Sequence, residues 1–318
     1  MRRIAVLISV PLLAVAVLAG CSSSPSGSSA SPKVSVTGGF GASPSVTIPH
    51  EQAGSSLTVK TLVQGSGPVL SKSDVFASNY AVYIWSGTTH KLVQSTFSAK
   101  NPQPLMAGQL LPGLRDALVG KKIGSRVLAV IPPADGYGKS GNPQAGIKGT
   151  DTLVFVVDML RKFPAAASGK QVSNGGGGLP TVTAAGTSAP KISIPSGKPP
   201  STLEARTLIQ GSGPVLVKGD TVVVQYVGMN WRTRSVFDSS WTRHQPFTFP
   251  IGATPSQVIK GWDLGLLGQK VGSRVLLVVP PADGYGKTGQ SRAGIKGTDT
   301  LVFAVDIVGA LGPGQPAS

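Results

Sequence analysis

The sequence predicts an α+β fold class: two tandem domains, each a curved antiparallel sheet wrapped around a short helix. The first observation is duplication, because "PPADGYGK" at 132–139 returns unchanged at 280–287 and "AGIKGTDTLVF" occurs at 145–155 and 293–303. A repeat of this length indicates a duplicated domain, since solenoid repeats run about 20 to 50 residues. The second observation is that strand patterns surround a single helical pattern without alternating with helices.

Strand signals dominate the second copy. The segments "TVVVQYVG" (221–228), "SRVLLVVP" (273–280) and "TLVFAVDIV" (300–308) are apolar and rich in β-branched residues, with turn residues at their ends. One helix is predicted over 256–268, which begins with a capping-type serine, has apolar residues at helical spacing and ends at a glycine.

Segments of low apolar content mark the domain boundaries. "AAASGKQVSNGGGG" (165–178) has too little apolar content to fold by itself and is typical of a flexible linker. The predicted organisation is a signal peptide (1–20), a flexible tether (21–52), a first domain (53–162), a linker with a short extended segment (163–200), a second domain (201–310) and a tail (311–318).

The N-terminus resembles a bacterial lipoprotein signal. Two arginines precede an apolar run over 4–18 that is too short for a membrane span, and "LAGC" ends at Cys21, the single cysteine. The resemblance implies cleavage before Cys21 and lipidation of its thiol, and two or three acyl chains anchor a protein stably. We expect a lipid-anchored protein on the extracytoplasmic face of the cell membrane. An ordinary secretory peptide with a chance cysteine, or an uncleaved anchor, is the alternative.

The chain has a net charge of +16, yet its basic residues form no run longer than two and are not interleaved with aromatic residues. This pattern argues against nucleic acid as a partner. Attraction to anionic lipid headgroups or wall polymers is one interpretation, and simple solubility is the other.

Metal, nucleotide and covalent chemistry find no support in the motifs. The second domain has one histidine, His244, and one glutamate, Glu204, and neither has a metal-ligand spacing. No GxSxG hydrolase signature occurs, and the stretch before "GKTG" (286–289) does not fit the phosphate-loop pattern GxxxxGK[ST], because its first glycine is missing. We therefore predict neither a cofactor nor a metal site.

Aromatic residues with a few polar groups distinguish the second domain. The strings "FDSSWTRHQPFTF" (237–249), "VIKGWDLGL" (258–266), "PPADGYG" (280–286) and "TLVFAVDIV" (300–308) closely resemble the FKBP class of peptidyl-prolyl cis-trans isomerases. The resemblance covers essentially all of 202–308. It implies a half-barrel sheet around a short helix, with an aromatic pocket that receives a proline ring.

The same resemblance implies roles for individual residues. Trp262 forms the pocket floor, and Phe249 belongs to the core. The Tyr285 hydroxyl and the backbone N–H of Ile259 donate to a substrate carbonyl, and Asp238 lies at the pocket edge near Arg243. The implied walls are Tyr226, Phe237, Phe247, Val258, Ile259 and Phe303.

The expected activity is acceleration of X-Pro isomerisation in exported proteins, without a nucleophile. The implied partners are proline-containing polypeptides and macrolide inhibitors, and we expect a monomer. The alternative is a membrane-anchored chaperone or binding module whose pockets hold proline-containing chains without physiologically important turnover.

The first domain departs from this pattern. Tyr80, Tyr137 and Phe155 match tyrosines and a phenylalanine of the second domain, but Leu114 replaces the tryptophan floor. Val93 and Gln94 stand at the positions of Phe237 and Asp238, and the segment 98–108 offers neither phenylalanine nor arginine. We expect weak or no isomerase activity there. An active domain with a different side-chain preference is the alternative.

Overall fold

The computed structural model describes residues 33–98 and 101–312. The predicted signal peptide, Cys21, the start of the tether and the tail from residue 313 lie outside the described residues. Within the described part of the chain, no helix is long and apolar enough to cross a membrane.

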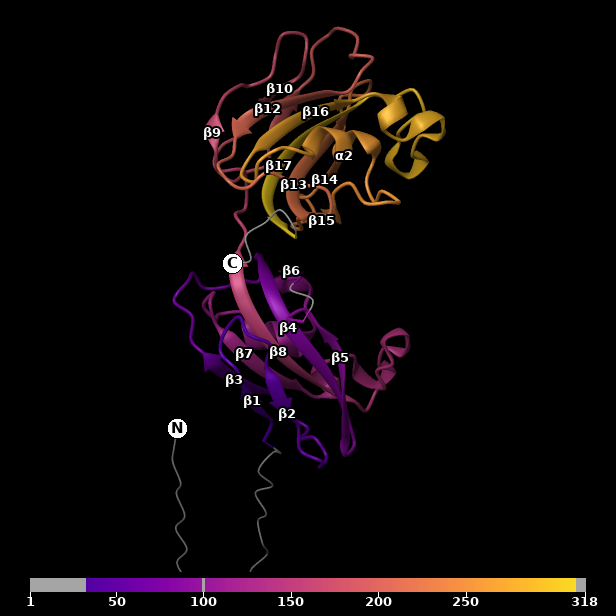
Figure 1. Ribbon diagram of the computed structural model, residues 1–318. Coiled ribbons are helices and arrows are strands. Elements are labelled where there is room, and N and C mark those ends of the chain that lie inside the picture. The colour runs from indigo at the N-terminus through magenta and orange to yellow at the C-terminus, as the bar shows by residue number, and fades with distance from the viewer. Residues whose placement is uncertain (1–32, 99–100, 313–318) are drawn as a thin grey trace, which may run out of the picture. The chain divides into compact units, whose positions relative to one another are not determined.

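The first domain is a six-stranded antiparallel sheet with one α-helix on its inner face (Figure 1). The strand order is β3-β7-β8-β4-β5, and β6 pairs with β4. Its strands are β3 (Thr58–Val63), β4 (Val75–Ser86), β5 (Thr89–Ser95), β6 (Gln103–Met106), β7 (Arg126–Ile131) and β8 (Thr152–Lys162). Its helices are η1 (Ala107–Gln109), α1 (Pro112–Leu118), η2 (Pro133–Asp135), η3 (Gly138–Ser140) and η4 (Pro143–Ala145).

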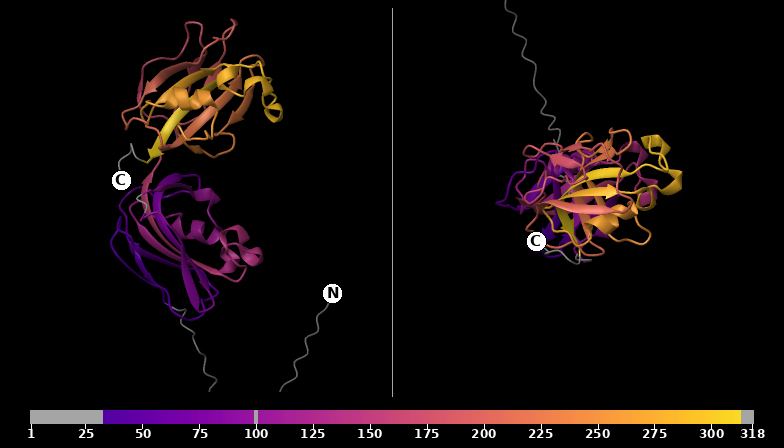
Figure 2. Two further views of the ribbon diagram at one scale, coloured as in Figure 1. Left: turned by 45° about the vertical axis from the view of Figure 1, so that its right-hand side comes forward. Right: turned by 90° about the horizontal axis from the view of Figure 1, so that it is seen from above.

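The second domain repeats this arrangement with one added strand, and the helix again lies on one face of the sheet (Figure 2). The order is β14-β13-β17-β16-β12-β9, and β15 pairs with β13. Its strands are β9 (Lys170–Gln171), β12 (Glu204–Gln210), β13 (Thr221–Asn230), β14 (Val236–Ser239), β15 (Phe247–Pro250), β16 (Arg274–Val279) and β17 (Leu301–Leu311). Its helices are α2 (Lys260–Leu266), η5 (Pro281–Asp283), η6 (Gly286–Thr288) and η7 (Ser291–Ala293).

Strand irregularities recur at the same places in both sheets. The β3–β7 ladder shifts register between Thr61 and Val63, and the β12–β16 ladder shifts between Thr207 and Ile209. Bulges increase the local twist and bend of a strand. The predicted α+β class with two curved antiparallel sheets is therefore confirmed.

A short β-hairpin covers the outer face of each sheet, which the sequence did not predict. Residues 33–52, expected to belong to a flexible tether, instead form β1 (Ser35–Thr37) and β2 (Ser45–Thr47). Val34, Val36, Val46 and Ile48 alternate along these strands and pack against the sheet. The alternation is a two-residue apolar period, hidden by the surrounding serine and glycine.

The expected linker 163–200 is likewise ordered. Its β9 extends the second sheet, and β10 (Thr181–Thr183) pairs with β11 (Lys191–Ser193) in a hairpin over the outer face. The docking matches in both domains, because Trp85 Nε1 donates to a carbonyl at Glu51 (2.9 Å) and Trp231 Nε1 to one at Gly197 (3.2 Å). Each domain therefore begins earlier than the sequence predicted.

The helix of the second domain is shorter than predicted. It spans Lys260–Leu266 rather than 256–268, and Ile259 is the N-cap without a side-chain cap. The Ser256 hydroxyl is not the helix cap: it accepts from the backbone N–H of Val258 at 3.2 Å, before the helix begins, and donates to Asp263 Oδ2 at 2.5 Å. Buried glycines let the helix approach the sheet, since a Cβ at Gly261 would lie 2.6 Å from Val279.

Candidate functional site

A cavity of about 480 Å³ lies between helix α2 and the inner face of the second sheet. Trp262 projects from α2 to its base and is 4% exposed. The indole N–H is buried and has no hydrogen-bond partner among the described residues. The base of the cavity is therefore a large, flat and almost wholly buried ring.

Aromatic rings surround Trp262 in edge-on contacts. Its ring centroid lies 5.0 Å from that of Tyr226 and 5.3 Å from that of Phe303, at interplanar angles of 86° and 90°. Phe247 lies 6.1 Å away and stacks on Phe249. Edge-to-face geometry is favourable for aromatic pairs and fixes each ring by its neighbours. The walls are preformed.

Gly228 makes room for two of these rings. It pairs with Phe303 across β13 and β17, and a Cβ there would lie 2.8 Å from Phe237 and 2.9 Å from Phe303. The ring centroids of Phe237 and Phe303 consequently lie 5.7 Å apart, with an interplanar angle of 89°. Sequence reasoning missed Gly228, although a lone glycine inside a β-branched strand signals close approach.

A polar group occupies one edge of the cavity. The Tyr226 hydroxyl donates to Asp238, and Arg243 forms an ion pair with the same carboxylate. Arg243 Nη2 also donates to the Tyr226 hydroxyl at 3.0 Å, and its guanidinium lies 5.4 Å from the Tyr226 ring centroid. The Asp238 side chain is 37% exposed, so this charge faces both solvent and cavity.

The repeated "PPADGYG" loop forms the opposite rim. Tyr285 is 37% exposed, and burial raises the pKa of its hydroxyl, which keeps it protonated and able to donate. Lys260, at the start of α2, pairs with Asp283 at 2.8 Å and ties this loop to the helix.

Asp263 holds the segment that leads into the helix. Its Oδ1 accepts from the backbone N–H of Gly252 at 2.8 Å and its Oδ2 from Ser256. This segment supplies Ser256 and Gln257 to the cavity lining. The sequence did not predict these contacts, because a serine and an aspartate seven residues apart, here Ser256 and Asp263, match no helix-capping pattern.

Nine of the ten predicted site residues line this one cavity. They are Tyr226, Phe237, Asp238, Phe247, Val258, Ile259, Trp262, Tyr285 and Phe303. The tenth, Arg243, reaches the site only through Asp238 and Tyr226. Phe249 is 1% exposed and belongs to the core, as expected.

The first domain has a cavity of the same volume, about 480 Å³, with a different lining. Leu114 lies at its base, and the Gln94 side-chain amide donates to the Tyr80 hydroxyl at 3.0 Å. Burial raises the pKa of Tyr80, and the hydrogen bond from Gln94 opposes that rise. No charged side chain is among the described residues of this lining. The lining is mainly aliphatic and uncharged, with Tyr80 and Phe155 as its other aromatic residues and Tyr137 at its rim.

Both domains are similar in sequence to known proteins. Residues 68–160 and 213–308 each match the family described as FKBP-type peptidyl-prolyl cis-trans isomerase. An FK506-binding protein of Streptomyces anulatus is 42% identical over 119 residues, which cover 37% of this chain and 94% of the relative. A probable FK506-binding protein of Corynebacterium glutamicum is 39% identical over 121 residues, covering 38% and 98%. The crystal structure of FkpA from Escherichia coli matches at 36% identity, with a TM-score of 0.32, over 38% of this chain and 52% of that one.

The two ranges that match the family model fall on the two sheet-and-helix units described above. The family's members are peptidyl-prolyl cis-trans isomerases, which act on proline-containing polypeptides. The chain belongs to the FKBP-type peptidyl-prolyl cis-trans isomerase family and carries two tandem domains of that family.

Proposed function

We propose that the second domain isomerises X-Pro bonds of exported polypeptides, with the proline ring seated on Trp262. The observation that carries this proposal is the preformed aromatic cavity of about 480 Å³ with one charged edge. The first domain, whose cavity lacks that edge and the tryptophan, has weak or no activity in this proposal.

The mechanism rests on differential binding. An X-Pro bond has a rotation barrier of about 18 to 20 kcal/mol because resonance holds it planar. At the twisted transition state conjugation is lost, so the amide needs less polar solvation than the planar form. A dry aromatic cavity therefore favours the twisted form. No bond breaks, and no nucleophile is required.

Hydrogen bonds at the rim hold the flanking peptide. The Tyr285 hydroxyl donates to one substrate carbonyl, and the backbone N–H of Ile259 donates to another. Ile259 precedes the first turn of α2, where N–H groups have no partner within a helix. The Asp238 carboxylate, paired with Arg243, favours the twisted amide by facing its carbonyl carbon across the cavity edge.

The test exchanges site residues between the domains of the full-length chain. The double variant Asp238→Gln with Trp262→Leu copies residues that the first domain carries in the same fold. We expect it to lose most cis-to-trans isomerisation of an Xaa-Pro peptide. The matched control is Gln94→Ala with Leu114→Ala in the first domain, which should leave the rate unchanged. Equal losses in both variants contradict the assignment to the second domain.

A holding function is the second candidate, and the uncharged cavity of the first domain favours it. That cavity keeps its volume although its aromatic lining is reduced, so a proline-containing chain can still occupy it. If client folding in cells survives the double variant while peptide turnover collapses, holding is the main role. If client folding is lost together with peptide turnover, isomerisation is the main role.

Location and inhibitor binding follow from the same proposal. Lipidation of Cys21 places the protein on the outer face of the cell membrane. Cys21→Ser should release the protein from the membrane fraction and remove the acyl mass from the intact protein. The second-domain cavity also binds macrolides such as FK506, and the double variant should weaken that binding while the control does not.

A further inference from the structure

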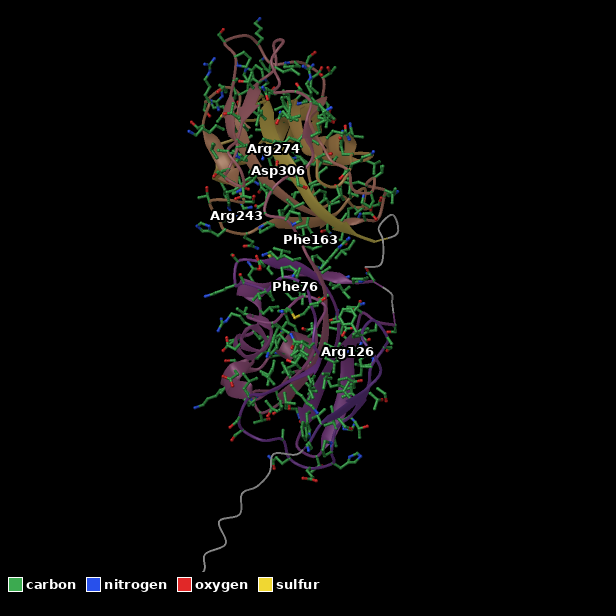
Figure 3. All side chains as sticks on the ribbon, turned by 90° about the vertical axis from the view of Figure 1, so that its left-hand side faces the viewer. Phe76, Arg126, Phe163, Arg243, Arg274 and Asp306 are labelled. Atoms are coloured by element: carbon green, nitrogen blue, oxygen red, sulfur yellow. The ribbon has the colours of Figure 1, made fainter. Side chains whose placement is uncertain are left out.

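A buried arginine–aspartate pair crosses the outer face of each sheet. Arg126 pairs with Asp158 at 2.6 Å, and Arg274 pairs with Asp306 at 2.5 Å. In both pairs the Nε and Nη2 atoms of the arginine donate to the two carboxylate oxygens. Arg126, Arg274 and Asp306 are labelled in Figure 3. The two ion pairs have the same geometry, but the two arginines differ in the further hydrogen bonds that their guanidinium groups donate.

Arg126 has hydrogen bonds along its outer edge as well. Its Nη1 donates to the carbonyl of Gly38 at 2.7 Å, and its Nη2 donates to the carbonyl of Ala42 at 2.6 Å. Gly41 N–H donates to Asp158 Oδ2 at 2.7 Å. The loop between β1 and β2 therefore covers the pair completely, and the Arg126 side chain is 0% exposed.

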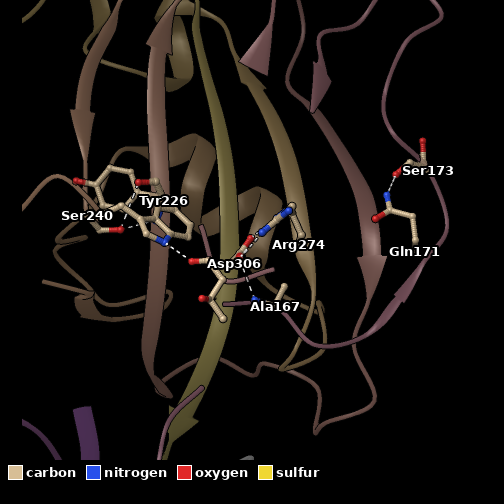
Figure 4. Close-up of polar contacts among 9 residues, drawn as sticks. Ala167, Gln171, Ser173, Tyr226, Ser240, Arg274 and Asp306 are labelled. Atoms are coloured by element: carbon tan, nitrogen blue, oxygen red, sulfur yellow. Dashed lines mark hydrogen bonds and ion pairs between the residues drawn. The ribbon is translucent and has the colours of Figure 1, made fainter. Parts of the chain in front are cut away.

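Arg274 lacks these carbonyl partners. Among the described residues its guanidinium bonds only to Asp306, so the Nη1 group donates to nothing. The backbone N–H of Ala167 takes the place of Gly41 and donates to Asp306 Oδ2 at 2.8 Å (Figure 4). The Arg274 side chain is nevertheless only 6% exposed. The outer edge that backbone carbonyls fill in the first domain thus has no acceptor among the described residues of the second.

The loop sequences explain the difference. In the first domain Gly38 has φ +98° and Gly41 has φ +83°, a region that side chains with a Cβ rarely adopt. Ala184 and Thr187 stand at these loop positions in the second domain. That loop takes another path, in which the Thr187 carbonyl accepts from Trp241 Nε1 at 3.1 Å. None of its carbonyl groups accepts a hydrogen bond from Arg274.

A cavity of about 330 Å³ occupies the space beside Arg274. Polar side chains of Gln171, Asn174 and Thr183 line it together with Arg274 and the loop residues Ala184 and Gly186. Consecutive side chains of a strand point to opposite faces of the sheet. The side chain of Val275 packs in the inner core, so that of its neighbour Arg274, and the cavity beside it, lie on the outer face. The cavity is separate from the prolyl site.

We propose that this cavity binds a carboxylate group on the outer edge of Arg274. In the first domain two carbonyl oxygens fill the Nη1 and Nη2 positions of Arg126, and a carboxylate offers two oxygens at the spacing of that fork. The net charge of +16 favours an anionic ligand over a neutral one. The ligand is an acidic side chain or a free C-terminus of a polypeptide. This site is independent of the proposed isomerase function.

The test titrates the full-length protein with sodium acetate at constant ionic strength and follows the arginine side-chain NMR signals. We expect a saturable shift of the Arg274 signal, with none at Arg126, which serves as the internal control. Acetamide has nearly the same shape without the charge and should be at least about tenfold weaker, as loss of a charge-assisted pair implies. An equal response to acetamide, or an equal shift at Arg126, overturns the proposal, as does tighter binding of inorganic phosphate than of acetate.

Variants separate binding from folding. Arg274→Lys removes the fork but disturbs a buried ion pair, so it can unfold the domain. Ala184→Gly with Thr187→Gly instead restores the glycines of the first-domain loop without touching the pair. This variant should let the loop close on Arg274 and abolish the acetate shift, and an unchanged acetate affinity contradicts the proposal. Acetyl-dialanine with a free C-terminus and acetyl-Ala-Glu-amide then distinguish a terminal from a side-chain carboxylate, and either as the stronger ligand supports the site.

Discussion

The Gln94 side-chain amide donates to the Tyr80 hydroxyl at 3.0 Å in the first domain. At the same place in the second domain, the Tyr226 hydroxyl donates to the carboxylate of Asp238. The strand registers make these pairs equivalent, since Gln94 pairs with Val82 and Asp238 pairs with Gly228, two residues beyond each tyrosine. One exchange thus reverses the direction of the hydrogen bond and removes a negative charge from the cavity edge.

Asp238→Gln alone should reproduce that reversal in the second domain. Hydrogen bonds to charged groups contribute roughly 1.5–3 kcal/mol, so we expect kcat/KM for an Xaa-Pro peptide to fall about 10- to 100-fold. Stability should change little, because the carboxylate is 37% exposed. The control is Asp116→Asn on the exposed surface of the first domain. A rate loss below about twofold would show that the charge of Asp238 has no part in isomerisation.

Gly228→Val should lower both activity and stability by displacing the rings of Phe237 and Phe303. Overpacking of this kind typically costs about 1–3 kcal/mol. Val82 and Val93 occupy the corresponding positions in the first domain, so Phe237→Val should recover much of the stability of Gly228→Val, but not its activity. A double-mutant cycle by chemical denaturation measures this coupling. Strictly additive losses contradict the steric explanation.

The aromatic site could be predicted because it depends on residue types in a fixed order. Trp262 and Phe303 stand in strings that resemble the family, and the structure brings both to one cavity. Gly228 and Asp263 escaped prediction because their roles appear only when distant segments meet.

The hairpins on the outer faces could not be predicted from composition. Only alternate residues such as Val182 and Ile192 are apolar, and each three-residue strand is too short to carry a period by itself. Their burial depends on the sheet beneath, where Leu276 and Val302 complete the outer cluster. Tertiary contact therefore orders segments that local sequence marks as linkers.

Acid should destabilise the second domain through Asp299. Its hydrogen bond from Arg232 holds the pKa of this carboxyl well below its ordinary value of 3.8. A depressed pKa contributes stability that is fully present above about pH 4 and is lost as pH falls through the folded value. The stability gap between wild type and Arg232→Met should therefore be widest at pH 7 and narrow below pH 3.8. Arg234→Met is the control, and a gap that does not change with pH contradicts the linkage.

Asp151 is the counterpart of Asp299 in the first domain, where no arginine stands at the position of Arg232. It precedes β8 as Asp299 precedes β17, and its Oδ1 is buried with no hydrogen-bond partner in the described part of the chain. Ile84 and Ser86 stand on β4 where Asn230 and Arg232 bind Asp299 in the second domain. An unpaired buried polar group costs about 1–3 kcal/mol.

Ser86→Arg should therefore stabilise the first domain by supplying the missing donor. We expect a gain of about 1–3 kcal/mol, the cost of the unpaired oxygen, if the new guanidinium reaches Asp151 as Arg232 reaches Asp299. Hydrogen exchange of the β8 amides in the full-length chain measures this gain locally. Thr88→Arg adds the same charge at an exposed position of the same turn and should have no such effect. Equal stabilisation by both variants would attribute the gain to surface charge, whereas a gain from Ser86→Arg that disappears with Asp151→Asn identifies the new ion pair.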